Sequence, residues 1–316
     1  MSSRAFFAVG LACALAVEGA DREDPRVTVT PRVAARRTAG PVAAIRVDVK
    51  QILVPVTVTD SFGTPVSGLP RETFRLFEDG VEQQLKSLTS QDAPVSLGVV
   101  FDASGSMEGR LDQSRTAVAR FCKTAIPGDE FFLVEFNDAP RILCQFTSDT
   151  ERIEKSLVAI KPRSWTALFD AVYLSMQQMK RAKNPRKALM ILSDGRDNNS
   201  RYTESEMKAL VREGDVCIYT IALVGGGLIK RHVRMLRQLS EETGGRLYEV
   251  NETSELPEAV SKISAAIRDQ YLLGYTPSDP RNNGLYRKIE VRLNQTPDVP
   301  RLRASWRNGY YAPEGW

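Results

Sequence analysis

A buried strand that runs directly into a small polar loop is the feature that most constrains this chain. An uninterrupted apolar run from Leu97 to Phe101 is followed at once by Asp102, Ser104 and Ser106, before a helical pattern begins. Such a run, bounded by a turn, indicates a strand buried on both faces. The carboxylate and the two hydroxyls therefore lie at the carboxyl end of a strand, where open α/β sheets place their ligands.

These three side chains allow two interpretations. Asp102, Ser104 and Ser106 all offer hard oxygen donors, which suit Mg²⁺ or Mn²⁺. Alternatively they form a capping turn, with Ser106 as the N-cap of the next helix and Asp102 placed favourably for the helix dipole. Short Asp/Ser/Gly turns are common, so the rest of the chain has to decide between them.

The central block, residues 94–270, alternates strand and helix patterns, which predicts an α/β fold with a doubly wound, mostly parallel sheet. Its strands are expected at 96–101, 131–136, 142–146, 188–193, 216–223 and 246–250. A short Asn-Asp-Ala-Pro link joins the second and third strands and predicts an antiparallel hairpin there.

Shorter alternating patterns lie on both sides of this block. Strands are expected at 47–50, 52–59, 74–78 and 81–88 before it, and at 271–275, 287–293 and 302–306 after it. Pro55 indicates a sheet edge within the second of these runs. Because a few strands cannot bury two faces, we predict a small β-sandwich built from both flanks around an inserted domain.

The first residues predict export. Arg4 precedes an apolar run from Ala5 to Val17, and residues 14–16 offer a small-residue cleavage site, which is typical of a secretory signal peptide. The run is short for a membrane span. An uncleaved anchor and a lipoprotein acylated at Cys13 are the alternatives, and membrane association is expected only if the segment stays uncleaved. The product is expected in the periplasm, on the cell surface or secreted.

The expected organisation follows from these patterns. Its parts are a signal peptide (1–20), an Arg/Pro/Ala/Thr-rich linker (21–45), N-terminal sandwich strands (46–90), the α/β domain (94–270) and C-terminal sandwich strands (271–316).

Composition and missing motifs exclude several function classes. The 43 basic and 39 acidic residues nearly balance, and no basic stripe is interleaved with aromatics, so no nucleic-acid partner is expected. Without a GxGxxG or GKT/GKS loop or a GxSxG elbow, and with His232 as the only histidine, neither a small-molecule cofactor nor an enzyme is predicted. Past the signal, Cys122, Cys144 and Cys217 are expected as buried free thiols, with Cys122–Cys144 the one pairing to test.

Three separated segments together resemble a known family. The run from Asp102 to Met107 resembles the DxSxS signature that opens the metal-ion-dependent adhesion site of von Willebrand factor type A (VWA) domains. Thr166, and Asp194 at the end of another apolar run, resemble the family's remaining site segments in the right order.

The flanks extend the resemblance. The segments 56–60, 77–80 and 271–275 are similar to the VWA-related family described from Acidobacteria. The resemblance therefore covers nearly all of the chain past the signal, and it implies a Rossmann-like VWA domain with a flanking sandwich.

The same resemblance implies how the site would work. Ser104, Ser106 and Thr166 would ligate Mg²⁺ (or Mn²⁺) directly, and Asp102 and Asp194 would hold it mainly through waters. Two carboxylates only neutralise the ion formally, so it stays electrophilic and open to an Asp or Glu of a protein partner. This implies an exported, non-catalytic protein-binding or adhesion module.

Alternatives remain for these residues. Thr166 could instead be the N-cap of a helix beginning at Ala167, and Asp194 could belong to an ordinary turn. Trp165 departs from the small residues that the family often places before the threonine. With Arg163 and Arg196 it is either a partner-contacting rim or simple packing and solvated charge. The alternative functions are metal-assisted hydrolysis and structural assembly with a non-functional metal site.

Overall fold

A computed structural model gives the architecture of most of the chain. It describes residues 51–89, 93–163, 165–224, 230–294 and 301–314. The predicted signal peptide, the linker and the strand at 47–50 lie outside these described residues. Within the described ranges, no helix is both long and apolar enough to cross a membrane.

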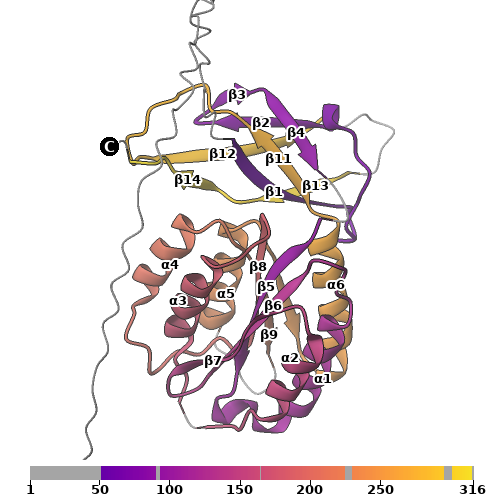
Figure 1. Cartoon of the computed structure of the whole chain (residues 1–316), viewed down its shortest axis with the longest axis vertical. Coiled ribbons are helices and arrows are strands. Elements are labelled where there is room, and N and C mark those ends of the chain that lie inside the picture. Colours follow the sequence, from indigo (N-terminus) through magenta and orange to yellow (C-terminus); the bar gives the residue numbers. More distant parts are fainter. Residues whose placement is uncertain (1–50, 90–92, 164, 225–229, 295–300, 315–316) are drawn as a thin grey trace, which may run out of the picture. The chain divides into compact units, whose positions relative to one another are not determined.

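A six-stranded sheet forms the centre of the α/β part (Figure 1). In spatial order its strands are β10 (Leu247–Val250), β9 (Cys217–Leu223), β8 (Arg186–Ser193), β5 (Val95–Asp102), β6 (Glu130–Phe136) and β7 (Pro140–Thr147). Neighbours are parallel except for β6 and β7, which form an antiparallel pair. The predicted doubly wound, mostly parallel sheet and its hairpin are confirmed.

Helices cover both faces of this sheet (Figure 1). The helices on one face are α1 (Leu111–Cys122), α2 (Thr150–Val158) and α6 (Leu256–Arg268). The helices on the other face are α3 (Leu168–Met179), α4 (Glu204–Glu213) and α5 (Lys230–Glu242). Three short 3-10 helices, η1 (Arg71–Thr73), η2 (Gly105–Arg110) and η3 (Thr253–Glu255), lie in the connections.

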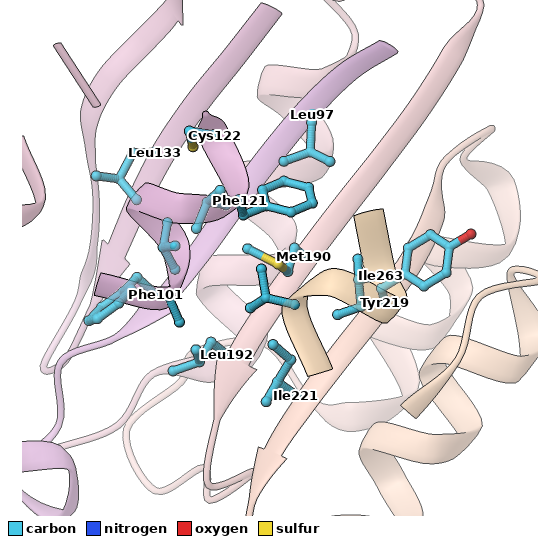
Figure 2. Packing of buried hydrophobic residues seen from close by; sticks show 14 of the residues in the cluster. Leu97, Phe101, Phe121, Cys122, Leu133, Met190, Leu192, Tyr219, Ile221 and Ile263 are labelled. Atoms are coloured by element: carbon cyan, nitrogen blue, oxygen red, sulfur yellow. The ribbon is translucent and has the colours of Figure 1, made fainter. Parts of the chain in front are cut away.

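Strand β5 is buried on both faces because its side chains alternate between two apolar clusters. Leu97 and Phe101 belong to the cluster under α1, α2 and α6 (Figure 2), and Val100 belongs to the cluster under α3, α4 and α5. Gly98 also faces the second cluster, where an added Cβ would lie 2.2 Å from Cζ of Phe132. A larger residue does not fit there, so the glycine permits the close packing of β5 against β6.

Two four-stranded antiparallel sheets enclose a third apolar cluster. The strands of one sheet are β13 (Arg303–Trp306), β1 (Ile52–Thr59), β11 (Tyr271–Tyr275) and β4 (Leu85–Thr89). The strands of the other are β14 (Gly309–Tyr311), β12 (Tyr286–Leu293), β2 (Phe74–Glu78) and β3 (Val81–Gln83). Each sheet combines strands from before and after the α/β part, so the predicted sandwich of flanking strands is confirmed. The domain boundaries themselves stay a prediction.

Two details of the flanks differ from the sequence-based expectation. The single strand expected at 81–88 is two strands in different sheets, because Gln83 pairs with β2 and Leu85 pairs with β11. Strands that change sheet in this way form the corners of sandwiches. Pro55 lies in β1, which pairs with β11 on one side and with β13 on the other. Pro55 itself pairs only with β11, because the pairing of β1 with β13 begins at Val56. The predicted edge is therefore local to the proline.

Candidate metal centre

Two buried carboxylates meet at the carboxyl-terminal ends of the central strands of the six-stranded sheet. Asp102 is the last residue of β5 and has no exposed surface, and Asp194 follows Ser193 at the end of β8 and is 3% exposed. Because β5 and β8 are parallel neighbours, both side chains lie side by side at the carboxyl-terminal ends of these strands. This is the arrangement that the two apolar runs predict.

Asp102 is held by neutral groups alone among the described residues. The backbone N–H of Ser104 donates to Oδ1 at 2.8 Å, and the hydroxyl of Ser193 donates to Oδ2 at 2.6 Å. Burial raises the pKa of Asp102 to about 6, although both hydrogen-bonding partners oppose the shift, and the negative charge of Asp194 adds to it. A buried carboxylate without a cation is costly in its charged form, so a bound cation would stabilise it.

The two serine hydroxyls after β5 have the spacing of neighbouring ligands. Oγ of Ser104 and Oγ of Ser106 are 3.1 Å apart. Adjacent ligands of an octahedral Mg²⁺, at about 2.0–2.1 Å from the ion, are separated by about 3 Å. The N-cap of η2 is Ser104 and that of α1 is Arg110, neither with a side-chain capping bond. The interpretation of Ser106 as the N-cap of the next helix is therefore wrong.

Thr166 lies 3% exposed in a loop that is tied to the segment after β8. Its N–H donates to Oδ1 of Asn198 at 2.9 Å, and its carbonyl accepts from the N–H groups of Asn198 and Asn199 at 3.0 and 3.1 Å. The N-cap of α3 is Ala167, without a side-chain capping bond, so the interpretation of Thr166 as that N-cap is wrong. The two asparagines hold Thr166 next to the segment that contains Asp194.

Hydrogen bonds connect the first and second site segments as well. The N–H of Arg163 donates to the carbonyl of Ala103 at 2.9 Å, and Ser104 and Arg163 form an isolated parallel bridge. In the third segment, the N–H of Gly195 donates to Oγ of Ser193 at 2.9 Å. Ser193 therefore joins the third segment to Asp102, and all three predicted segments come together. Ligand roles for their side chains stay a prediction.

The predicted rim residues are all at the surface. Trp165 is 54% exposed and Arg163 is exposed. The side chain of Arg196 is 47% exposed, with Nε 3.6 Å from Oδ2 of Asp194. This guanidinium compensates the charge of Asp194 in part, whereas no described residue supplies a cation to Asp102.

The donor set suits a hard cation. Within the described ranges, no three His, Cys, Asp or Glu side chains form a group that could hold a metal, and the candidate centre instead combines two carboxylates with hydroxyls. Cys122, Cys144 and Cys217 are free and buried. Burial raises the pKa of Cys122 and of Cys217 to about 12, and all three cysteines belong to the apolar cluster under α1, α2 and α6.

Comparison with known proteins identifies the class of this domain. Residues 97–196 match the family model of the von Willebrand factor type A domain. The match spans the segments of Asp102, Thr166 and Asp194, so this part of the chain is a VWA domain. The likeness of its flanks to the acidobacterial family stays a prediction.

Solved structures share the fold at low sequence identity. Proximal thread matrix protein 1 of the mussel byssus, solved with a zinc-occupied MIDAS motif, is 18% identical with a TM-score of 0.51, covering 60% of this chain and 49% of that one. A variant of the PilB minor pilin from Streptococcus sanguinis is 14% identical with a TM-score of 0.50, covering 56% of this chain and 62% of the pilin. The vWF domain of the pili tip protein Mfa5 from Porphyromonas gingivalis is 15% identical with a TM-score of 0.49, covering 57% and 96%. A search of curated proteins found no match.

Proposed function

We propose that this protein is an exported, non-catalytic protein-binding module with a metal-ion-dependent adhesion site. Ser104, Ser106 and Thr166 ligate a divalent cation, and Asp102 and Asp194 hold it mainly through waters. The ion coordinates an Asp or Glu of a protein partner. The observation that carries this proposal is the fully buried Asp102, which has neutral hydrogen-bonding partners and no ion pair within the described part of the chain.

The charges of the donor set favour an anionic partner. A bound divalent cation supplies a positive centre that accepts a further oxygen ligand. Asp102 and Asp194 cancel its charge only formally, and the three hydroxyls add none. A cage of four carboxylates would remove the attraction for another anion, whereas this donor set keeps it.

The structural relatives support the same class of function. They are named as a matrix protein of the mussel byssus and a minor pilin, which fits an exported protein that contacts other proteins. The mussel protein holds zinc in its MIDAS motif, so Zn²⁺ joins Mg²⁺ and Mn²⁺ as an ion to test.

Isothermal titration of the full chain with each of the three ions tests the proposal. We expect one saturable site in the parent protein, weakened at least about tenfold in Asp102→Ala and in Thr166→Ala. Asp112→Ala is the matched control, because it removes a carboxylate whose side chain is 86% exposed on α1, and it should bind like the parent. Circular dichroism verifies that each variant is folded.

Weak binding of the ion alone is addressed by a second titration. Acetate, added as a carboxylate probe, should strengthen ion binding because it completes the coordination. Absence of binding in the parent with and without acetate would overturn the proposal.

A further inference from the structure

An exposed tryptophan lies directly beside the candidate metal centre. Trp165 precedes Thr166 in the chain and is 54% exposed, whereas Trp306 in β13 is half-buried. Large aromatic side chains are usually well buried in a folded protein. Tryptophan is also among the residues most enriched where binding energy concentrates in protein interfaces. An exposed indole next to a ligand loop is therefore a candidate for partner contact.

The backbone that carries this indole is held in place. The N–H of Trp165 donates to Oδ1 of Asp138 at 3.1 Å, and Nδ2 of Asn199 donates to the carbonyl of Asp138 at 2.6 Å. The next N–H, that of Thr166, donates to Oδ1 of Asn198 at 2.9 Å. Because the attachment is ordered before binding, a partner loses less conformational entropy when it packs on the indole.

The charges around Trp165 favour an apolar contact over a cationic one. Arg163 is exposed, and its guanidinium has no ion pair in the part of the chain that the structure describes. Arg196 is a second cation of the rim, with its side chain 47% exposed. Asp138, which accepts the N–H of Trp165, adds one negative charge beside these two cations. The two arginines outnumber this carboxylate, so the net charge of these three side chains disfavours a cationic partner group more than an apolar one.

We propose that Trp165 is a specificity-determining contact for the partner, and that the partner segment presents an acidic residue followed by an aromatic or large aliphatic one. This inference rests on the proposed function, because the acidic residue is the one that completes the ion. Trp165 and Thr166 are adjacent, with Cα atoms about 3.8 Å apart, so the exposed indole is attached one residue away from a proposed ligand of the ion. Packing the two apolar groups together removes both from water.

Three blocked tetrapeptides serve as probes: acetyl-Gly-Asp-Phe-Gly-amide, its Asp-Ser analogue and its Asp-Lys analogue. Their dissociation constants are measured by ligand-observed NMR with the full chain and saturating Mg²⁺. The Asp-Phe peptide should bind the parent about tenfold more tightly than the Asp-Ser peptide, which is the size of a modest interface hot spot. In Trp165→Ala this ratio should fall to about one, while the affinities for Mg²⁺ and for the Asp-Ser peptide stay unchanged.

Two variants separate a binding role from a structural one. Trp165→Phe keeps an aromatic ring and should retain part of the preference for the Asp-Phe peptide. Phe62→Ala removes a different aromatic side chain, 92% exposed in the turn after β1, and should keep the full preference. The backbone bond to Asp138 is available to every residue at position 165 except proline, so the loop should keep its conformation.

The outcomes distinguish this inference from the function on which it rests. Equal binding of the Asp-Phe and Asp-Ser peptides, or no binding of either by a protein that binds Mg²⁺, would overturn the role of Trp165 and leave the metal centre standing. Tighter binding of the Asp-Lys peptide would replace the apolar contact with a cation–π contact. Failure of the parent to bind any ion would remove the proposed function and this inference together.

Discussion

Two buried carboxylates of this protein are satisfied in different ways. Glu78 in the sandwich is 3% exposed and accepts hydrogen bonds from the hydroxyls of Tyr275 and Tyr310, and Oε1 lies 3.6 Å from Nη1 of Arg287. Asp102 at the sheet edge is fully buried and accepts only neutral donors within the described residues. In the part of the chain that the structure describes, Glu78 has a cation beside it and Asp102 has none.

The charge of Glu78 is structural, because it is paired inside the protein. The charge of Asp102 is available to a bound ion. A buried ion pair that is complete holds two segments together and attracts nothing further. Asp129 is a second example of the complete kind, because it accepts from the N–H groups of Val95 and Ile126 and also pairs with Arg268. Within the described residues Asp102 has no such partner, and this is the observation on which the proposed cation site rests.

The largest expected effect is in the sandwich. Arg287→Met leaves Glu78 buried without its cation, and it also removes the 2.6 Å ion pair between Arg287 and Asp279. We expect the free energy of unfolding to fall by about 3–5 kcal/mol in urea titrations. The double variant Arg287→Met with Glu78→Gln should regain part of the loss. A loss below about 1 kcal/mol would show that the buried Glu78 does not depend on Arg287 as its cation.

The next effect concerns the neutral support of Asp102. Ser193→Ala removes the hydroxyl that donates to Asp102 and accepts from Gly195. Since hydrogen bonds to charged groups contribute about 1.5–3 kcal/mol, we expect a loss of that order in urea, together with weaker ion binding by titration. Ser156→Ala is the control, because it removes a hydroxyl of α2 that donates to the carbonyl of Arg152. It should leave ion binding unchanged.

Alkaline pH should weaken the sandwich through its buried tyrosines. Burial, reinforced by the hydrogen bond to Glu78, raises the pKa of Tyr310 to about 12, and the pKa of Tyr275 is raised by the same causes. A tyrosine that keeps its proton longer in the folded state contributes stability that is complete below about pH 10 and is lost between about pH 10 and 12. Urea midpoints measured from pH 8 to 11 should fall in the parent and fall less in Tyr310→Phe. If the midpoints of both proteins fell equally with pH, Tyr310 would not be the cause.

The smallest expected change in stability is at the candidate metal centre itself. Asp102→Asn keeps an acceptor for the N–H of Ser104 and a polar partner for Ser193 while it removes an uncompensated buried charge. In EDTA we expect its free energy of unfolding to stay within about 1 kcal/mol of the parent value or to exceed it. Ion binding should nevertheless be lost in calorimetric titrations. A destabilisation as large as that of Arg287→Met would show that Asp102 is a structural charge.

Much of the fold follows from local patterns. Apolar runs predicted the central strands β5, β8 and β9, because a strand that is buried on both faces is mostly apolar. The sequence does not reveal the switch between β3 and β4, because residues 81–88 contain no Gly or Pro that would mark a break. The switch depends on pairing with β2 and β11, which lie far apart in the sequence.

The candidate site was predictable where it depends on strand ends and less so where it depends on loops. Asp102 and Asp194 end parallel neighbouring strands, so their meeting follows from the topology. Ser193, Asn198 and Asn199 were not among the predicted site residues, although they position Asp102 and Thr166. Their only sequence signal was proximity to Asp194, since their partners are 32 or more residues away along the chain.

The way in which the VWA domain is connected to the sandwich has a mechanical consequence. The chain enters this domain from β4 and leaves it through α6 into β11, and β4 and β11 are paired antiparallel neighbours. The last residue of α6 lies near the start of β5, because Asp129 bonds both Val95 and Arg268, whereas Asp102 ends the same strand. A force applied at the carboxyl end of β5 and resisted by the sandwich would therefore act along the length of this strand. Such a force would load the backbone hydrogen bonds from β5 to β6 and β8 together, in shear. It would not open them one after another.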